Sequence, residues 1–206
     1  MITIVDYAAG NLTSVKRALD YLTIPCEITA DPRKVVSAER IIFPGVGHAG
    51  FAMKILAERR LDTALREAFA KKTPILGICL GTQIILSSSE ETPLPCLGLL
   101  PGTCPKFRLT DPSLKIPHMG WDAITINKPH TVLRHFTPQT EVYFVHSFYP
   151  QPALESDVYA VCDYEVSFPA VIGRENLIAT QFHPEKSGKP GLELLSNFAA
   201  WEGTSC

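Results

Sequence analysis

Residues 74–86 read PILGICLGTQIIL, and residues 77–81 within this stretch, GICLG, place Cys79 between two glycines. The apolar run at 74–78 is typical of a buried strand, and the residues that follow have helical spacing. A cysteine at such a junction matches the nucleophile elbow, a tight turn that needs small neighbours and exposes its nucleophile at the start of a helix. Free N–H groups there favour an ionised thiol. The alternative is an ordinary buried cysteine, a common environment for free thiols.

Length and charge limit the classes of protein. The chain has 206 residues, enough for one large domain that buries a core without disulfides or a metal ion, so we expect a single domain over residues 1–206. The formal net charge is −2 and no basic run occurs, so we expect neither nucleic acid nor a membrane as partner. The apolar stretches are strand-sized, which predicts no transmembrane helix, and residues 1–6 do not have the layout of a signal peptide.

The cysteines indicate a compartment. Six of them, at positions 26, 79, 96, 104, 162 and 206, are scattered without a C-x-x-C pair. This pattern favours free thiols in a reducing cytoplasm over a disulfide framework or a zinc site. We therefore expect a cytoplasmic protein with no metal and no cofactor.

Strand and helix patterns alternate in the first half of the chain. Strands are expected at 2–7, 26–30, 40–43 and 74–78, and helices at 12–22 and 51–71, the second broken near Arg60. After Thr92 prolines become frequent, strand patterns follow at 123–126, 141–148, 158–163, 170–173 and 177–181, and a helix at 191–201 closes the chain. These patterns predict an α/β fold: an open, mainly parallel twisted sheet with helices on both faces, plus antiparallel hairpins.

One histidine has a carboxylate placed by its own backbone. Residues 183–185, His-Pro-Glu, follow the strand pattern that ends near 182. In extended backbone, residues i and i+2 face the same side about 6–7 Å apart, and Pro184 biases His183 towards that geometry. Glu185 can then hold one ring nitrogen while the other faces a thiol, which is what a cysteine nucleophile requires of its base. Taken alone, the run is also typical of a polar loop after a strand.

A glycine-rich segment, PGVGHAG at 44–50, ends the strand expected at 40–43. Sites in open α/β sheets are built at this edge. Glycines on both sides of Val46 leave its N–H free to face a ligand, and with the N–H of Leu80 it can form a two-donor oxyanion hole. Removing one such donor typically costs about 3–4 kcal/mol. A plain turn is the alternative, and a phosphate loop is disfavoured because G-x-x-x-x-G-K-[ST] is absent.

These three motifs, in this order, resemble the class I (triad-type) glutamine amidotransferases. Further segments closely resemble the glutaminase subunits of imidazole glycerol phosphate synthase, a family of histidine biosynthesis: DYAAGNL at 6–12, PHMGW at 117–121, YFVHS at 143–147 and QFHPEKS at 181–187. The resemblance covers residues 4 to about 198 and implies that family's flavodoxin-like architecture. Departures from the family pattern are Ala8 for a common glycine, Thr82 for a common methionine, and Ser147-Phe148 for a Thr-Tyr type pair.

The resemblance implies roles for individual residues. The nucleophile falls on Cys79, the base on His183 and the orienting carboxylate on Glu185, with the backbone N–H groups of Leu80 and, after its peptide reorients, Val46 as oxyanion donors. The implied glutamine-binding residues are Gly45, Gly47, Gln83, Glu91, Ser147 and Phe148. The family's partner is a (β/α)₈ cyclase subunit, and the positions implied to face it are Asn11, Trp121, Tyr143 and Lys186.

The implied activity is hydrolysis of glutamine through a Cys79 thioester. The ammonia would pass to the cyclase, which makes imidazole glycerol phosphate and an aminoimidazole carboxamide ribonucleotide. Free ammonia is mostly protonated near neutral pH and would be lost to bulk water, so we expect a docked partner and gating. We expect Val46 to be the gate, its N–H turned away until the partner and the nucleotide bind.

Other functions remain open at this point. The chain could be a different class I glutaminase, such as the subunit serving pyridoxal phosphate synthase, or a γ-glutamyl hydrolase. The segments PHMGW and DYAAGNL weigh against both. A regulatory protein that kept the fold would not need Cys79, His183 and Glu185 together. A cysteine peptidase on a related fold would cleave peptides and ignore free glutamine.

Overall fold

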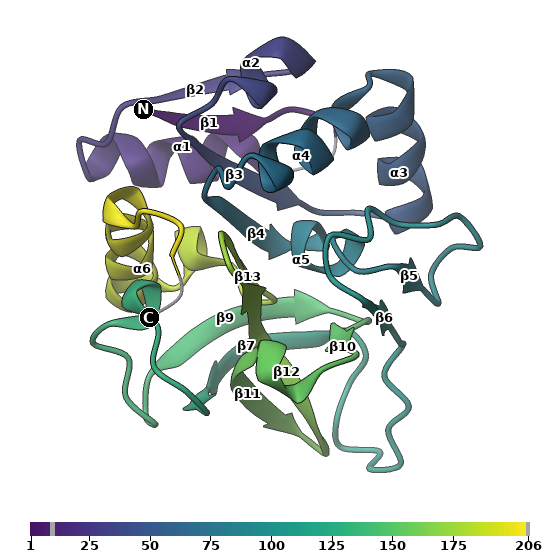
Figure 1. Ribbon diagram of the computed structural model, residues 1–206. Coiled ribbons are helices and arrows are strands. Elements are labelled where there is room, and N and C mark those ends of the chain that lie inside the picture. Colours follow the sequence, from purple (N-terminus) through teal and green to yellow (C-terminus); the bar gives the residue numbers. More distant parts are fainter. Residues whose placement is uncertain (9–10, 205–206) are drawn as a thin grey trace.

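The computed structural model describes residues 1–8 and 11–204 and is built around one long mixed sheet (Figure 1). The sheet has eight strands in the order β2-β1-β3-β4-β13-β12-β11-β8. Its parallel part contains β1 (Ile2–Val5), β2 (Cys26–Thr29), β3 (Arg40–Gly45), β4 (Ile75–Cys79) and β13 (Leu177–Thr180). The antiparallel part continues through β12 (Val166–Arg174), β11 (Val158–Tyr164) and β8 (Thr125–Ile126).

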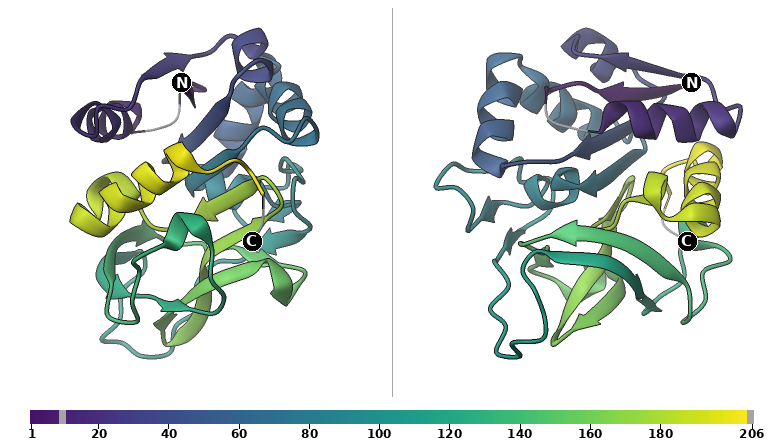
Figure 2. Two further views of the ribbon diagram at one scale, coloured as in Figure 1. Left: turned by 60° about the vertical axis from the view of Figure 1, so that its left-hand side comes forward. Right: turned by 180° about the vertical axis from the view of Figure 1, so that it is seen from behind.

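Helices cover both faces of the parallel part, as the left view of Figure 2 shows. On one face lie α1 (Leu12–Tyr21) and α6 (Gly188–Ala200), and on the other α2 (Pro32–Val36), α3 (Ala49–Glu58) and α4 (Leu61–Ala70). Each face has its own apolar core. Val15, Leu19 and Phe198 are fully buried in the first, and Leu56 and Leu65 in the second. Burial on both faces is why the parallel strands read as continuous apolar runs in the sequence.

Smaller elements lie beside the antiparallel part of the sheet. A two-stranded ribbon pairs β7 (His118–Ala123) with β9 (Glu141–His146), and a small sheet joins β5 (Ser88–Ser89), β6 (Gly102–Cys104) and β10 (Gln151–Pro152). The remaining short helices are α5 (Leu80–Ile84), η1 (Thr131–Leu133), η2 (Glu155–Asp157) and η3 (Pro184–Lys186). The ribbon supplies one wall of the site described below.

Most of the predicted architecture is confirmed, with corrections at element boundaries. The helical pattern at 51–71 is two helices that meet at Arg60, whose φ of 57° is left-handed and interrupts the helix. The single strand predicted at 123–126 is wrong, because β7 ends at Ala123 and β8 begins at Thr125 in a different sheet. Helix α2 was not predicted. It begins at Pro32, and the carboxylate of Asp31 caps it by accepting a hydrogen bond from the N–H of Arg33.

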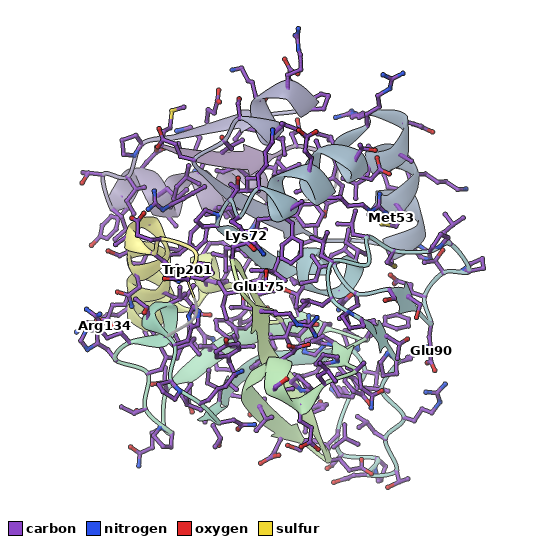
Figure 3. The ribbon with its side chains drawn as sticks, in the orientation of Figure 1. Met53, Lys72, Glu90, Arg134, Glu175 and Trp201 are labelled. Atoms are coloured by element: carbon purple, nitrogen blue, oxygen red, sulfur yellow. The ribbon has the colours of Figure 1, made fainter. Side chains whose placement is uncertain are left out.

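An ion pair joins the turns that lead into the two central strands. Lys72, before β4, pairs with Glu175, before β13, and Figure 3 shows the two side chains next to each other. In the residue after Glu175, the side-chain amide of Asn176 donates to the backbone oxygens of Phe69 and Thr73. These contacts link the turns that precede β4 and β13, and the parallel pairing of the two strands aligns the segments carrying Cys79 and His183.

Candidate active site

Three strand ends meet at one edge of the parallel sheet. In the pairing register, Gly45 at the end of β3 lies beside Cys79 at the end of β4, and Thr180 of β13 lies beside Ile78. Because these strands are parallel, the segments that follow them leave the sheet on the same side. The sheet thereby brings together residues 45–47, Cys79 and the segment after Thr180.

The backbone at Cys79 has the strained conformation of a nucleophile elbow. Its φ is 53° and its ψ is −107°, a region that non-glycine residues rarely occupy. The flanking glycines are required by space. A Cβ on Gly81 would lie 2.0 Å from the backbone oxygen of Phe43, and one on Gly77 would lie 2.9 Å from the Cβ of Ala179. The predicted need for small residues on both sides of the cysteine is therefore confirmed.

His183 and Glu185 form the hydrogen-bonded pair predicted from their spacing. The ring Nδ1 of His183 lies 2.8 Å from Oε1 of Glu185, and both side chains are 1% exposed. A carboxylate at this distance accepts, so Nδ1 carries the proton. The other ring nitrogen, Nε2, is buried and makes no hydrogen bond within residues 1–8 and 11–204, which leaves it available to Cys79.

The charge state of His183 is set by opposing effects. Burial lowers its pKa, but the interactions with Cys79 and Glu185 together outweigh burial and raise the pKa to about 10. At neutral pH the ring is therefore an imidazolium. An imidazolium beside Cys79 stabilises the thiolate, which is the reactive form of a cysteine.

A cavity of about 280 Å³ opens over Cys79. Most of the residues predicted to bind glutamine or to stabilise the oxyanion line it. The lining residues are Val46, Gly47, Cys79, Leu80, Gln83, Glu91, Pro117, Val145, His146, Ser147 and Phe148. Gly45 is an exception, because it lies behind the wall, where a Cβ would be 1.9 Å from the hydroxyl oxygen of Tyr7. The prediction missed Pro117, Val145 and His146, which enter the cavity wall only because β7 and β9 pair.

Glu91 ties two walls of the cavity together. Its Oε2 accepts a hydrogen bond of 2.6 Å from the backbone N–H of Ala49, the first residue of α3. The residue therefore fixes the end of the glycine-rich segment 44–50 while its charge stays at the cavity. A carboxylate in this place suits a ligand that carries an ammonium group.

On the opposite wall, a buried histidine fixes the backbone of Phe148. Nδ1 of His146 lies 2.8 Å from the backbone oxygen of Phe148, so this nitrogen carries a proton. Burial lowers the pKa of His146 to about 3, so the ring is neutral and Nε2 must accept. Nδ1 of His118 lies 3.3 Å from that nitrogen and therefore donates, and Nε2 of His118 lies 2.6 Å from the carboxylate of Asp122. Burial lowers the pKa of His118, and this effect outweighs the opposing contact with Asp122.

Three of the residues predicted to face a partner gather on the outer face of the β7–β9 ribbon. The ring of Trp121 lies 6.0 Å from that of Tyr143, and Nζ of Lys186 lies 5.7 Å from the Tyr143 ring. Trp121 is 50% exposed, as is typical of an aromatic residue on a binding surface. Asn11, the fourth residue, caps α1 through its backbone oxygen, and its side chain accepts a hydrogen bond from Ser14.

The described residues contain neither a membrane-spanning helix nor a cluster of metal ligands. None of the helices in residues 1–8 and 11–204 is long and apolar enough to cross a bilayer. Within the same residues, no group of three or more His, Cys, Asp or Glu side chains is arranged to hold a metal ion. The described cysteines, at 26, 79, 96, 104 and 162, are all free thiols.

Comparison with known proteins places this chain among the glutamine amidotransferases. The family model described as glutamine amidotransferase class-I matches residues 3–201. The imidazole glycerol phosphate synthase subunit HisH of Desulfovibrio desulfuricans is 51% identical over 205 residues, covering 96% of this chain and 93% of the relative. The corresponding subunit of Nitrosococcus oceani is 40% identical, with 99% of each chain covered.

Solved structures show the same fold at much lower identity. PurLQS from Thermotoga maritima superimposes with a TM-score of 0.75 at 19% identity, with 96% of each chain covered. A crystal structure described as glutamine amidotransferase gives a TM-score of 0.74 at 18% identity, covering 98% of this chain and all of that one. The chain therefore belongs to the class-I glutamine amidotransferase family, within the group of the imidazole glycerol phosphate synthase subunit HisH.

Proposed function

We propose that the protein is the glutaminase subunit of an imidazole glycerol phosphate synthase. It hydrolyses glutamine to glutamate and ammonia and passes the ammonia to a cyclase subunit with a (β/α)₈ fold. The observation that carries this proposal is the strained Cys79 under a small polar cavity, beside the buried pair of His183 and Glu185. Relatives that match over nearly the full length are named as subunits of that synthase.

The cavity suits free glutamine. Glu91 offers a negative charge to the α-ammonium group, and Gly47, Gln83, Ser147 and Phe148 offer polar groups around it. Both N–H bonds of the Gln83 amide are used within the protein, so its oxygen is the atom left for a ligand. The side-chain amide of glutamine then points at Cys79.

In the acylation step the thiolate of Cys79 attacks the amide carbon of glutamine. Negative charge develops on the amide oxygen and is stabilised by the backbone N–H groups of Leu80 and Val46. The imidazolium of His183 gives its Nε2 proton to the amide nitrogen, the carbon–nitrogen bond breaks, and ammonia leaves behind a γ-glutamyl thioester.

In the deacylation step neutral His183 removes a proton from a water molecule. The hydroxide attacks the thioester carbon, and glutamate leaves as the sulfur departs as a thiolate. Glu185 keeps the ring in the same tautomer and orientation through both steps. Val46 acts as the gate, because its N–H turns to the oxyanion only when the partner and the nucleotide are bound.

The partner docks on the ribbon face, where Trp121, Tyr143 and Lys186 gather and Asn11 completes the contact. We further propose that residues 1–206 form one domain and that the protein works in the cytoplasm, where its free thiols stay reduced.

Glutamate release tests the proposal directly. We expect slow release from the protein alone, strong stimulation by the cyclase and its nucleotide ligand, and no release above background from Cys79→Ala. Activity of Cys79→Ala would remove the mechanism. Full activity without the partner would contradict the subunit assignment, and cleavage of peptides without turnover of free glutamine would favour a peptidase.

A further inference from the structure

The backbone oxygen of Phe148 fixes the direction of the hydrogen bonds around it. It lies 2.8 Å from Nε2 of Gln83 and 2.8 Å from Nδ1 of His146. A carbonyl oxygen can only accept, so both nitrogens donate to it. The amide orientation of Gln83 follows from this partner, and the position of its nitrogen is determined.

The same nitrogen of Gln83 lies 3.1 Å from Oε1 of Gln181. Because an amide nitrogen does not accept, the oxygen of Gln181 must face it, and the amide of Gln181 has one allowed orientation. In that orientation, Nε2 of Gln181 lies 3.7 Å from Sγ of Cys79. Gln181 is 0% exposed, so no bulk water competes for this N–H.

We propose that Gln181 is a further catalytic residue, which donates a hydrogen bond to the Cys79 thiolate. A hydrogen bond to the charged form of a group favours that form, and it is stronger when the site is dry. The N–H stabilises the attacking thiolate before acylation and receives the sulfur again when it departs from the thioester. The inference rests on the proposed glutaminase function for its catalytic role, but the hydrogen bond itself requires no substrate.

The other groups that interact with Cys79 do not supply this donor. The Tyr7 hydroxyl and the Cys104 thiol affect Cys79 through charge alone: the hydroxyl of Tyr7 has no hydrogen-bond partner in the described residues, and burial raises the pKa of both groups. His183 supplies a positive charge from the neighbouring segment and is in turn held by Glu185. Gln181 therefore adds a neutral N–H donor to Sγ of Cys79, and its orientation is fixed by Gln83.

The pH dependence of Cys79 alkylation tests the inference without glutamine or partner. The full-length protein is treated with iodoacetamide over a pH series, and mass spectrometry of the peptide containing residue 79 separates this cysteine from the others. The variant Gln181→Met keeps an unbranched side chain of similar length but cannot donate. We expect the midpoint of its alkylation profile to move upward by about one pH unit, with about tenfold slower alkylation below the midpoint.

Two further variants complete the test. Gln139→Met makes the same change on an exposed loop, and its alkylation profile should match that of the unmodified protein. Gln83→Met leaves Gln181 intact but removes the N–H that orients it, so its midpoint should also move upward, by less. This variant decides the outcome if Gln181→Met does not fold.

An unchanged midpoint in folded Gln181→Met, or in Gln83→Met if the first variant is unfolded, overturns the inference. In the assembled synthase, kcat for glutamate release should fall about tenfold in Gln181→Met. If the synthase releases no glutamate at all while the alkylation midpoint still moves, the proposed function fails and the hydrogen bond stands.

Discussion

Ala8 occupies a backbone conformation that suits glycine better. Its φ is 60°, and its N–H donates a 2.9 Å hydrogen bond to the carboxylate of Asp6, which closes a tight turn after β1. A Cβ in the left-handed region costs about 1–2 kcal/mol. The family often has glycine at this position. The alanine of this chain therefore has a physical cost in the structure.

We expect Ala8→Gly to stabilise the protein by up to about 1 kcal/mol, because relief of the left-handed strain exceeds the entropy that glycine gains in the unfolded chain. Urea unfolding measures the change. Ala123→Gly is the matched control, since Ala123 is an exposed residue of strand β7, and there the same substitution should destabilise. Equal destabilisation by both changes would contradict the argument.

Among the secondary-structure elements, the short helix η1 depends on a histidine that must stay neutral. Nδ1 of His130 accepts a 3.1 Å hydrogen bond from the N–H of Val132 and so caps η1. The ring packs edge-on against Tyr159 and Trp201. Burial and, secondarily, the charge of Lys128 lower the pKa of His130 to about 4. Protonation of Nδ1 would remove the acceptor and place a charge beside the buried Trp201.

Acid should therefore weaken this contact between η1 and the end of α6. The folded pKa lies below the unfolded value of about 6.5, so the stability that neutral His130 contributes is fully present above pH 6.5 and is lost as the pH falls towards 4. In His130→Asn the capping acceptor remains but does not titrate. We expect its free energy of unfolding to fall less between pH 7 and pH 5 than that of the unmodified protein.

Urea unfolding followed by tryptophan fluorescence at both pH values measures this difference. The buried His146 also has a lowered pKa, but it contributes equally to both proteins and cancels from the comparison. His135→Asn changes an exposed histidine of the same loop and should leave the pH dependence as it was. An unaltered pH dependence in His130→Asn would show that protonation of His130 does not cause the loss of stability in acid.

The elements differ in how well the sequence predicts them. Some features depend only on neighbours within a few residues, and local spacing is sufficient to predict them. These are β4, the cysteine elbow and the His183–Glu185 pair. Strand β7 contains His118, Gly120 and Asp122 on its inner face, so no apolar alternation marks it, and it was missed. The contact of Gln181 with Cys79 was accessible in principle, since Gln181 and His183 are two residues apart and share a face in extended backbone.

The whole molecule combines a parallel half that holds the nucleophile with a ribbon that covers it. His146, Val145 and Pro117 reach the cavity only through the pairing of β7 with β9, a long-range contact that periodicity cannot show. The ribbon also carries the exposed Trp121 on its outer face. One two-stranded element thus borders both the cavity and the proposed partner surface.

Trp121→Ala should weaken binding to the cyclase subunit by about 2 kcal/mol, roughly thirtyfold in Kd, because buried tryptophans dominate interface energies. Calorimetric titration with the purified cyclase measures it. Leu154→Ala is the matched control, since Leu154 is also 50% exposed but lies outside the ribbon. Equal binding by the two variants would remove Trp121 from the interface. Cys79 alkylation in the free protein should be the same in both.

The distance along the chain between Cys79 and His183 has a consequence during biosynthesis. The histidine leaves the ribosome 104 residues after the cysteine (183 − 79 = 104), a delay of about 5–20 s at ordinary elongation rates. Through that interval the nascent thiol has no imidazolium beside it, and the ribbon that forms the cavity wall is complete only once His146 has been made. The cysteine therefore gains the positive charge that stabilises its thiolate only after the strands that wall its cavity have been synthesised.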